Sequence, residues 1–367
     1  MIFYGKQSID QDDIDAVVSV LKSDFLTQGS KISEFEQDLS SYCGARHAKV
    51  VSNATAALHL AYLAIGLTKD DIVWTVPNTF VATANAALYC GAKVDFIDID
   101  NKTYNLSIDA LKLKLIQAKK DNKLPKLVVP VHFAGQSCEM KSIWALSKEY
   151  SFNVIEDASH ALGGEYLDAK VGSCKYSDIT VFSFHPVKMI TTGEGGAILT
   201  NKKNLDDKVA LLRSHGITKD DSLFKNKNDG DWYYEQQTLG FNYRLTDMQA
   251  ALGISQLKKL DEFVAKRQEI AQRYLSQLKG VVLPYQHPDT NSSWHLFVIQ
   301  VKNRREVYEQ LKAQEILAQV HYIPVNEQPF YNQMPLPNSL DLYQHCLSLP
   351  IYVDLSIKEQ HQVIDCL

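Results

Sequence analysis

The residue best suited to covalent chemistry is Lys188, which lies between an apolar run at 181–184 and a glycine-rich turn at 193–196. A lysine in an apolar cleft loses hydration as an ammonium, so its pKa falls and a nucleophilic amine forms near neutral pH. Such an amine can form a Schiff base with a carbonyl, and pyridoxal phosphate is the carbonyl cofactor most often bound in this way. Taken alone, the segment fits equally well a loop lysine paired with Glu194.

An acidic residue favours the cofactor interpretation. Residues 152–157 have the pattern of a short buried strand that ends in the carboxylate of Asp157. In a parallel sheet the C-terminal ends of the strands line the ligand crevice. A carboxylate there can pair with a protonated pyridine nitrogen. By itself Asp157 would more often be a helix cap or turn residue, but together with Lys188 it indicates a cofactor site.

An anion-binding element precedes both residues. Residues 49–58 run from a strand through a turn of small residues into an alanine-rich helix. Unpaired backbone N–H groups and the helix dipole favour an anion at such a start. Thr55 and Ser183 could add hydroxyl donors. The alternative is ordinary N-capping by Ser52 or Asn53.

The composition is that of an ordinary globular protein. The chain has 367 residues, of which 45% are hydrophobic and 22% charged, enough for one large α/β domain and a smaller one. The net charge of −5 is not the basic charge that is typical of a nucleic-acid-binding protein. No apolar run is long enough to span a bilayer and no signal-peptide pattern begins the chain, so we expect a cytoplasmic protein.

The cysteine pattern indicates neither disulfides nor a metal site. The six cysteines lack C-x-x-C spacing, which fits free thiols better than a disulfide framework. No cluster of histidine, cysteine and carboxylate residues has the spacing of metal ligands, so we expect no bound metal.

Strands and helices alternate along the first two thirds of the chain. We predict helices at 81–90, 108–118 and 140–150, and strands at 71–76, 94–97, 126–131, 153–155, 178–184 and 196–200. This βαβα order predicts a doubly wound, mostly parallel sheet with helices on both faces. We expect residues 1–245 to form a large domain that binds the cofactor.

The N-terminal segment has the pattern of an amphipathic helix. Residues 8–21 should begin with a capping box formed by Ser8 and Gln11. Its apolar residues recur at i, i+3, i+4 and i+7, and they are Ile14, Val17, Val18 and Leu21. A second helix carrying Phe35 and Leu39 should follow a turn at 26–30.

The C-terminal part has an α+β pattern. Residues 244–278 form a long helical stretch, with possible breaks near Gly253 and Leu260. A strand at 294–301, a helix at 305–313 and a strand at 318–320 follow. Residues 246–367 should therefore comprise a linking helix and a small domain. The polar segment at 220–231 is expected to be a mobile surface loop.

Six motifs in order resemble one family along nearly the whole chain. They lie at 52–58, 156–161, 183–188, 193–196, 213–216 and 240–245. In type and spacing they are similar to the DegT/DnrJ/EryC1/StrS sugar aminotransferases, which have the pyridoxal-phosphate fold type I. The resemblance implies a homodimer with the active site at the subunit interface, acting on nucleotide-linked keto-sugars.

The resemblance also implies roles for individual residues. Lys188 would carry the cofactor and Asp157 would pair with its ring nitrogen. The other expected cofactor contacts are Ala54, Thr55 and Ser183 at the phosphate, Phe80 stacked on the ring, His160 beside it, and Asn242 at the phosphate of the other subunit's cofactor. Phe80 could instead be a core aromatic, and Asn242 a loop cap.

The same resemblance implies which residues lie at the substrate end of the cleft. Thr27 and Gly29 match a T-x-G turn expected near the nucleotide, and His321 and Tyr322 are expected at the sugar end of the cleft. The polar segment at 220–231 departs from the family pattern, so it could reshape the nucleotide entrance.

Three segments are most similar to one branch of the family. Residues 80–85, 252–259 and 315–325 resemble the enzyme of the pseudaminic acid pathway. That enzyme moves an amino group from L-glutamate to C4 of a UDP-linked 2-acetamido-2,6-dideoxy-4-keto-hexose, with pyridoxamine phosphate formed between the half-reactions. Alternatives are another UDP- or dTDP-linked keto-sugar aminated at C4 or C3, an amino-acid aminotransferase or desulfurase, and a non-enzymatic regulator. A sugar dehydratase would have histidine in place of Lys188.

Overall fold

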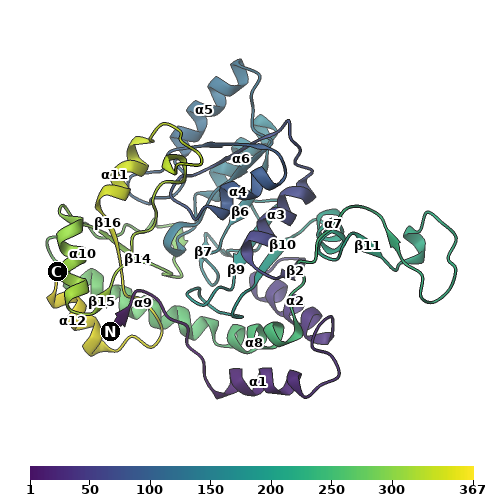
Figure 1. Ribbon diagram of the computed structural model, residues 1–367. Coiled ribbons are helices and arrows are strands. Elements are labelled where there is room, and N and C mark those ends of the chain that lie inside the picture. Colours follow the sequence, from purple (N-terminus) through teal and green to yellow (C-terminus); the bar gives the residue numbers. More distant parts are fainter.

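A seven-stranded sheet forms the centre of the computed structural model, which describes residues 1–367 (Figure 1). In spatial order its strands are β2 (His47–Val51), β10 (Gly196–Thr200), β9 (Ile179–Ser183), β6 (Asn153–Asp157), β5 (Leu127–Val129), β3 (Ile72–Thr75) and β4 (Lys93–Phe96). Strand β10 is antiparallel to both of its neighbours, and all the other pairs are parallel. The predicted, mostly parallel sheet is confirmed.

Helices cover both faces of this sheet. On one face lie α3 (Ala54–Ile65), α4 (Ala82–Tyr89) and α7 (Lys203–Arg213), and on the other lie α2 (Ser30–Cys43), α5 (Ile108–Lys120), α6 (Met140–Tyr150) and α8 (Asp247–Lys258). Neighbouring strand residues point to opposite faces. Val181 therefore packs in one core and Phe182 in the other, which explains the uninterrupted apolar runs.

The helix α1 spans Gln11–Leu21, and its predicted start is wrong. Asp10 is the N-cap and forms a capping box with Asp13. The Ser8 hydroxyl instead donates to Asp354, at 3.2 Å. A carboxylate at position 10 can accept the N–H of residue 13, so the helix begins two residues later than the Ser8 pattern indicated.

The predicted apolar stripe on α1 does not face the core of this chain. Ile14, Val18 and Leu21 are exposed, whereas Asp13 and Val20 are buried. The Asp13 carboxylate accepts hydrogen bonds from Gln256 and Lys259, both at 2.7 Å. Polar contacts to the end of α8 therefore orient α1, rather than its apolar periodicity.

The long C-terminal helical stretch is interrupted once. Helix α8 ends at Lys258 and α9 spans Leu260–Gln277, so the break near Leu260 is confirmed and the one at Gly253 is wrong. Gly253 allows close packing instead, because a Cβ there would lie 2.4 Å from the ring of Phe35. Phe35 and Leu39 of α2 are fully buried, as predicted.

A smaller α+β layer follows. It contains the antiparallel strands β14 (Phe297–Gln300) and β16 (Cys346–Leu349) and the helices α10 (Arg304–Ala313), α11 (Pro337–His345) and α12 (Ile357–Asp365). Strand β15 (Ile316–Leu317) pairs with β1 (Ile2–Phe3) at the N-terminus. The predicted strand at 318–320 is wrong, because only Gln319 makes an isolated bridge, to Ser348.

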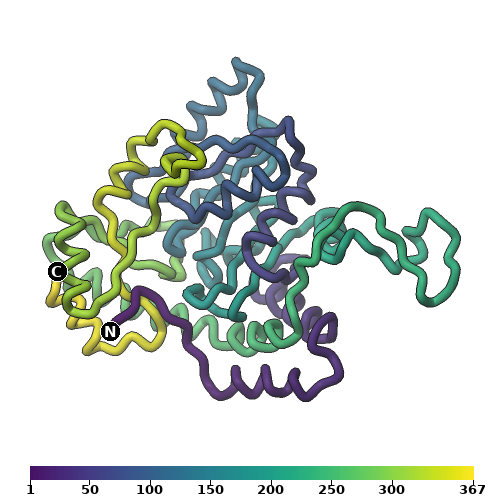
Figure 2. Tube along the Cα trace, in the orientation of Figure 1, coloured from purple at the N-terminus to yellow at the C-terminus, as the bar shows by residue number.

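Residues 217–236 form an arm that extends away from the body (Figure 2). Its base is the antiparallel pair β11 (Ile217–Thr218) and β12 (Glu235–Gln236). The Glu235 carboxylate accepts the backbone N–H groups of Lys225 and Asn226, each at 2.7 Å. The segment predicted as a loop at 220–231 is the outer part of this arm. A separate small sheet contains β7 (Glu165–Tyr166), β8 (Ala169–Lys170) and β13 (Thr290–Asn291).

Two further features bear on the function. No helix has both the length and the apolar character required to cross a bilayer. All six cysteines are free thiols, and no group of three or more potential metal ligands comes together in the fold.

Candidate active site

A cleft of about 1050 Å³ opens at the C-terminal edge of the parallel strands. Most of the site residues expected from the sequence line it, namely Ala54, Thr55, Phe80, Asp157, His160, Ser183, Lys188, His321 and Tyr322. These residues come from four strand ends of the large sheet and from the smaller α+β layer. The cleft therefore lies where the two layers meet.

Lys188 lies in the turn that follows β9, at the floor of the cleft. Burial lowers the pKa of its amine to about 8, and the nearby charge of Asp157 opposes that shift. The Lys188 Nζ lies 3.4 Å from Nε2 of His295. Glu194 makes no ion pair with Lys188, so the interpretation as a salt-bridged loop lysine is not supported.

The carboxylate of Asp157 is held on both oxygens. The Thr83 hydroxyl donates to Oδ2 at 2.7 Å, and the Ser159 hydroxyl donates to Oδ1 at 2.7 Å. The side chain is 4% exposed. A carboxylate fixed in this way at the end of β6 can pair with a cationic ring nitrogen without reorienting.

The first turn of α3 forms the anion-binding end of the cleft. The Asn53 side chain accepts the N–H of Ala56 at 2.8 Å, so the N-capping alternative is correct for Asn53. The N–H groups of Ala54 and Thr55 have no partner within the helix, and both residues line the cleft. Capping by Asn53 therefore leaves the N–H groups of Ala54 and Thr55 available for an anion.

A glycine lets the neighbouring strand approach this turn. Gly196 begins β10 and is in register with Ser183 of β9. A Cβ at Gly196 would lie 2.7 Å from the carbonyl carbon of Asn53 and 2.8 Å from the nitrogen of Ala54. Any side chain there would displace the helix start from the Ser183 hydroxyl.

Aromatic side chains flank the cleft. Phe80 is 60% exposed at its rim, so the alternative of a core aromatic is wrong. His160 is buried, and its Nε2 lies 3.0 Å from the Tyr322 hydroxyl. Burial, with a smaller contribution from the Lys188 charge, holds the pKa of His160 well below its usual value. The imidazole is therefore neutral.

Sequence reasoning missed His295, which lies at the cleft floor beside Lys188. It sits in the run Trp294–Val301 that was interpreted only as a strand. The available signal was a histidine directly before the apolar run at 296–299, because a buried polar side chain needs a partner. Thr83 and Ser159, which fix Asp157, were missed as well.

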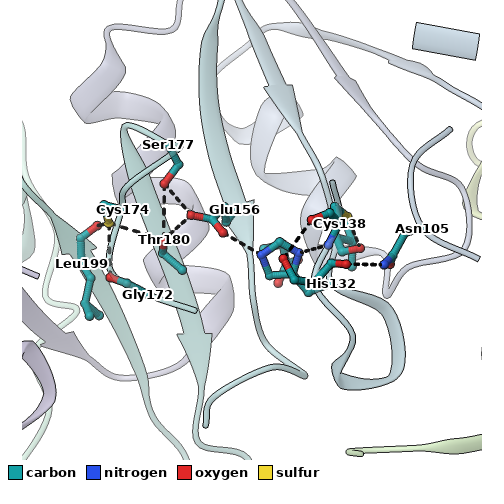
Figure 3. Close-up of polar contacts among 12 residues, drawn as sticks. Asn105, His132, Cys138, Glu156, Gly172, Cys174, Ser177, Thr180 and Leu199 are labelled. Carbon is teal, nitrogen blue, oxygen red and sulfur yellow. Dashed lines mark hydrogen bonds and ion pairs between the residues drawn. The ribbon is translucent and has the colours of Figure 1, made fainter. Parts of the chain in front are cut away.

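Behind the cleft, the Glu156 side chain lies on the opposite face of β6 and links this strand to residues next to β5 and in β9 (Figure 3). It is in contact with His132 at 2.7 Å, and it accepts hydrogen bonds from Ser177 at 2.5 Å and Thr180 at 2.8 Å. Burial alone would raise the pKa of Glu156, but these hydrogen bonds lower it. The backbone N–H of Cys138 lies 3.1 Å from the His132 Nδ1, so the hydrogen bond to the Glu156 carboxylate is donated by the His132 Nε2.

Three expected site residues do not line the cleft of this chain. Thr27 and Asn242 are exposed, and Gly29 donates its N–H to Asp247 at 2.8 Å. Gly29 lines a separate pocket of about 290 Å³ with Arg244. Within one chain, Thr27, Gly29 and Asn242 therefore lie apart from the residues expected to hold the cofactor.

The residues of the cleft fit pyridoxal phosphate. Free N–H groups and the Ser183 hydroxyl suit a phosphate, and the fixed Asp157 suits a pyridine nitrogen. Lys188 is an amine whose pKa is lowered to about 8, which favours attachment to a carbonyl.

Comparison with known proteins decides the family. Residues 7–367 match the profile of the DegT/DnrJ/EryC1/StrS aminotransferase family. The chain belongs to this family. Its members depend on pyridoxal phosphate, and so does this enzyme: the similar Streptococcus pneumoniae protein Spr1654 was solved in a PMP form, with 25% identity, a TM-score of 0.89 and coverage of 100% of this chain and 98% of that one.

Two further relatives are more similar in sequence. The UDP-4-amino-4,6-dideoxy-N-acetyl-beta-L-altrosamine transaminase of Campylobacter jejuni (serotype O:23/36, strain 81-176) is 44% identical over 100% of this chain and 96% of its own length. The structure of Helicobacter pylori PseC, an aminotransferase involved in pseudaminic acid biosynthesis, superposes with a TM-score of 0.91 at 35% identity, covering 100% of this chain and 97% of that one. The expected fold type is confirmed.

The lowered pKa of Lys188 predicts a distinctive pH dependence. In the chain freed of cofactor, an amine-specific reagent should label Lys188 half-maximally near pH 8, because only the uncharged amine reacts. Exposed lysines should be labelled with a midpoint of about 10.4. Peptide mass spectrometry across a pH series measures both. Asp157→Asn should move the Lys188 midpoint lower, and a midpoint near that of exposed lysines would contradict the assigned burial.

The Glu156 network predicts a stability effect. His132→Leu should lower the free energy of unfolding by about 3 kcal/mol, because the buried carboxylate loses a charge-assisted hydrogen bond. Urea unfolding followed by circular dichroism measures the loss. Adding Glu156→Gln should recover part of it, since no buried charge is then left without its partner. Equal stability of His132→Leu and the native chain would show that the pair does not stabilise the fold.

Proposed function

We propose that this enzyme moves an amino group from L-glutamate to C4 of UDP-2-acetamido-2,6-dideoxy-beta-L-arabino-hexos-4-ulose. The product would be UDP-4-amino-4,6-dideoxy-N-acetyl-beta-L-altrosamine, a precursor of pseudaminic acid. The observation that carries this proposal is the 44% identity, over the whole chain, to a transaminase named for that product. The composition of the cleft supports the chemistry.

In this proposal Lys188 carries the cofactor and then moves the proton. Bound pyridoxal phosphate supplies an electron sink for the carbon that loses its proton. Once released from the cofactor, the Lys188 Nζ can accept that proton near neutral pH, because burial has lowered its pKa to about 8. Asp157 would keep the ring nitrogen of the cofactor protonated, and Thr83 and Ser159 hold the Asp157 carboxylate in place.

The other residues of the cleft bind and orient. Ala54, Thr55 and Ser183 would hold the phosphate, and Phe80 would cover one face of the ring. His160 would lie beside the ring, fixed by Tyr322. His321 and Tyr322 would face the sugar from the smaller layer, where the His321 Nδ1 lies 2.8 Å from the Ser348 hydroxyl.

We further propose that the enzyme is a homodimer with shared active sites. Asn242 is exposed outside its own cleft, close to the base of the arm, so it is free to reach the phosphate site of a second copy. Gly29 lines a pocket with Arg244, and Thr27 forms a bridge with Thr246, so both would contact the nucleotide bound in the partner. The large domain would comprise residues 1–245 and the small one 246–367, although β1 pairs with β15 of the latter.

A two-step assay tests the reaction. Enzyme loaded with pyridoxal phosphate should convert to the pyridoxamine form with L-glutamate, as followed by absorbance. Adding the UDP-4-keto-sugar should restore the first spectrum and give an amino-sugar whose position NMR assigns. Lys188→Ala should show neither change, and borohydride should no longer fix the cofactor to the chain. Turnover of a dTDP-linked or 3-keto sugar, but not of the UDP-4-keto sugar, would overturn the substrate assignment.

Subunit mixing tests the shared site. Asn242→Leu should weaken cofactor binding in the homodimer, because a phosphate contact is lost. Hybrids of Asn242→Leu with Lys188→Ala chains should recover activity, since one cleft then has its own Lys188 and the intact Asn242 of the other chain. If mixing and refolding the two variants restores no activity beyond their average, Asn242 acts within its own chain or not at all.

A further inference from the structure

The amine of Lys188 has a nearby hydrogen-bond partner besides its charged neighbour Asp157. Its Nζ lies 3.4 Å from Nε2 of His295, at the buried end of the cleft. His295 is 4% exposed and comes from the smaller layer, just before β14. The lysine turn of the large sheet is thus in direct contact with the second layer through this side chain.

His295 is itself held firmly in place. The guanidinium of Arg267 in α9 is fully buried and donates to the backbone carbonyls of Trp294 and His295, each at 3.3 Å, and to that of Ile351 at 2.9 Å. The ring of His295 packs against that of His160, with 4.4 Å between the centroids. Main chain and ring are therefore both fixed.

The protonation state of His295 decides which atom can accept a hydrogen bond. Burial, then the charge of Lys188, holds the pKa of His295 well below its usual value, so the ring is neutral. Its Nδ1 has no protein partner. A neutral ring with its proton on Nδ1 presents the lone pair of Nε2 to the lysine amine.

We propose that His295 is a positioning residue for Lys188, whose Nε2 accepts a hydrogen bond from the lysine Nζ and holds the amine at the cleft floor whenever it is not bonded to the cofactor. A neutral acceptor suits this task, because a second carboxylate would trap the amine as an ammonium. The inference rests on the proposed role of Lys188 as the cofactor lysine. It adds a residue from the smaller layer to the residues of the large sheet that are proposed to hold the cofactor.

The pH series described for Lys188 tests this directly. The titratable groups that face the pair are Asp157, His160, His185, Arg267, His321 and Tyr322. In the full-length chain freed of cofactor, His295→Leu should lower the apparent pKa of Lys188 by about one unit, because the ammonium loses its acceptor while the site stays dry. His295→Gln, which can place an amide oxygen near the Nε2 position, should keep the native midpoint.

Matched controls separate this role from a purely structural one. His295→Asn is too short to reach Lys188 and should behave like His295→Leu, which keeps the test valid if the leucine variant fails to fold. His321→Leu removes another buried histidine of the same cleft, one with no hydrogen bond to Lys188, and should leave the Lys188 midpoint unchanged. In the loaded enzyme, His295→Leu should lower kcat with glutamate about 10-fold or more, with KM for the sugar unchanged.

Two results would overturn the proposal. One is a native Lys188 midpoint in both His295→Leu and His295→Asn. The other is an equal shift in His295→Gln and His295→Leu, which would mean that packing rather than the hydrogen bond sets the midpoint. Because labelling needs neither cofactor nor sugar, these results are independent of whether the proposed transamination is correct.

Discussion

The active site depends on two adjacent carboxylates that point to opposite faces of one strand. Glu156 faces away from the cleft and joins β6 to its neighbours through His132, Ser177 and Thr180. Asp157 faces the cleft, where two hydroxyl groups hold it. A buried charge is stable only when its hydrogen bonds are complete. The hydrogen bonds of Glu156 therefore fix the end of β6, from which Asp157 points into the cleft.

The parts of the site that lie at strand ends could be predicted from the sequence. Asp157 and Ser183 each follow an apolar run, and parallel strands bring their C-terminal ends to one edge. The partners that come from other layers could not be found in this way. Thr83 is in a helix, and His295 belongs to the smaller layer, so only the packing of distant segments brings them to Asp157 and Lys188.

The exposed apolar stripe of α1 shows what a sequence pattern does not determine. Periodicity indicates which face of a helix is apolar, but it does not identify what covers that face. Ile14, Val18 and Leu21 are exposed on α1, while Asp13 is buried and its Oδ2 accepts hydrogen bonds from Lys259 and Gln256. Asn242 is a different case, because the family resemblance places it at the phosphate of the other subunit's cofactor, and it does not line the cleft of its own chain.

The charge balance of the cleft explains why one lysine can both give and accept a proton. His160, His295 and His321 stay neutral, since burial and the nearby ammonium each disfavour a further positive charge. Asp157 opposes the effect of burial on Lys188, so the pKa of the amine falls only to about 8. Both forms of the amine are then populated near neutral pH, and neither is so stable that it blocks the return of the proton.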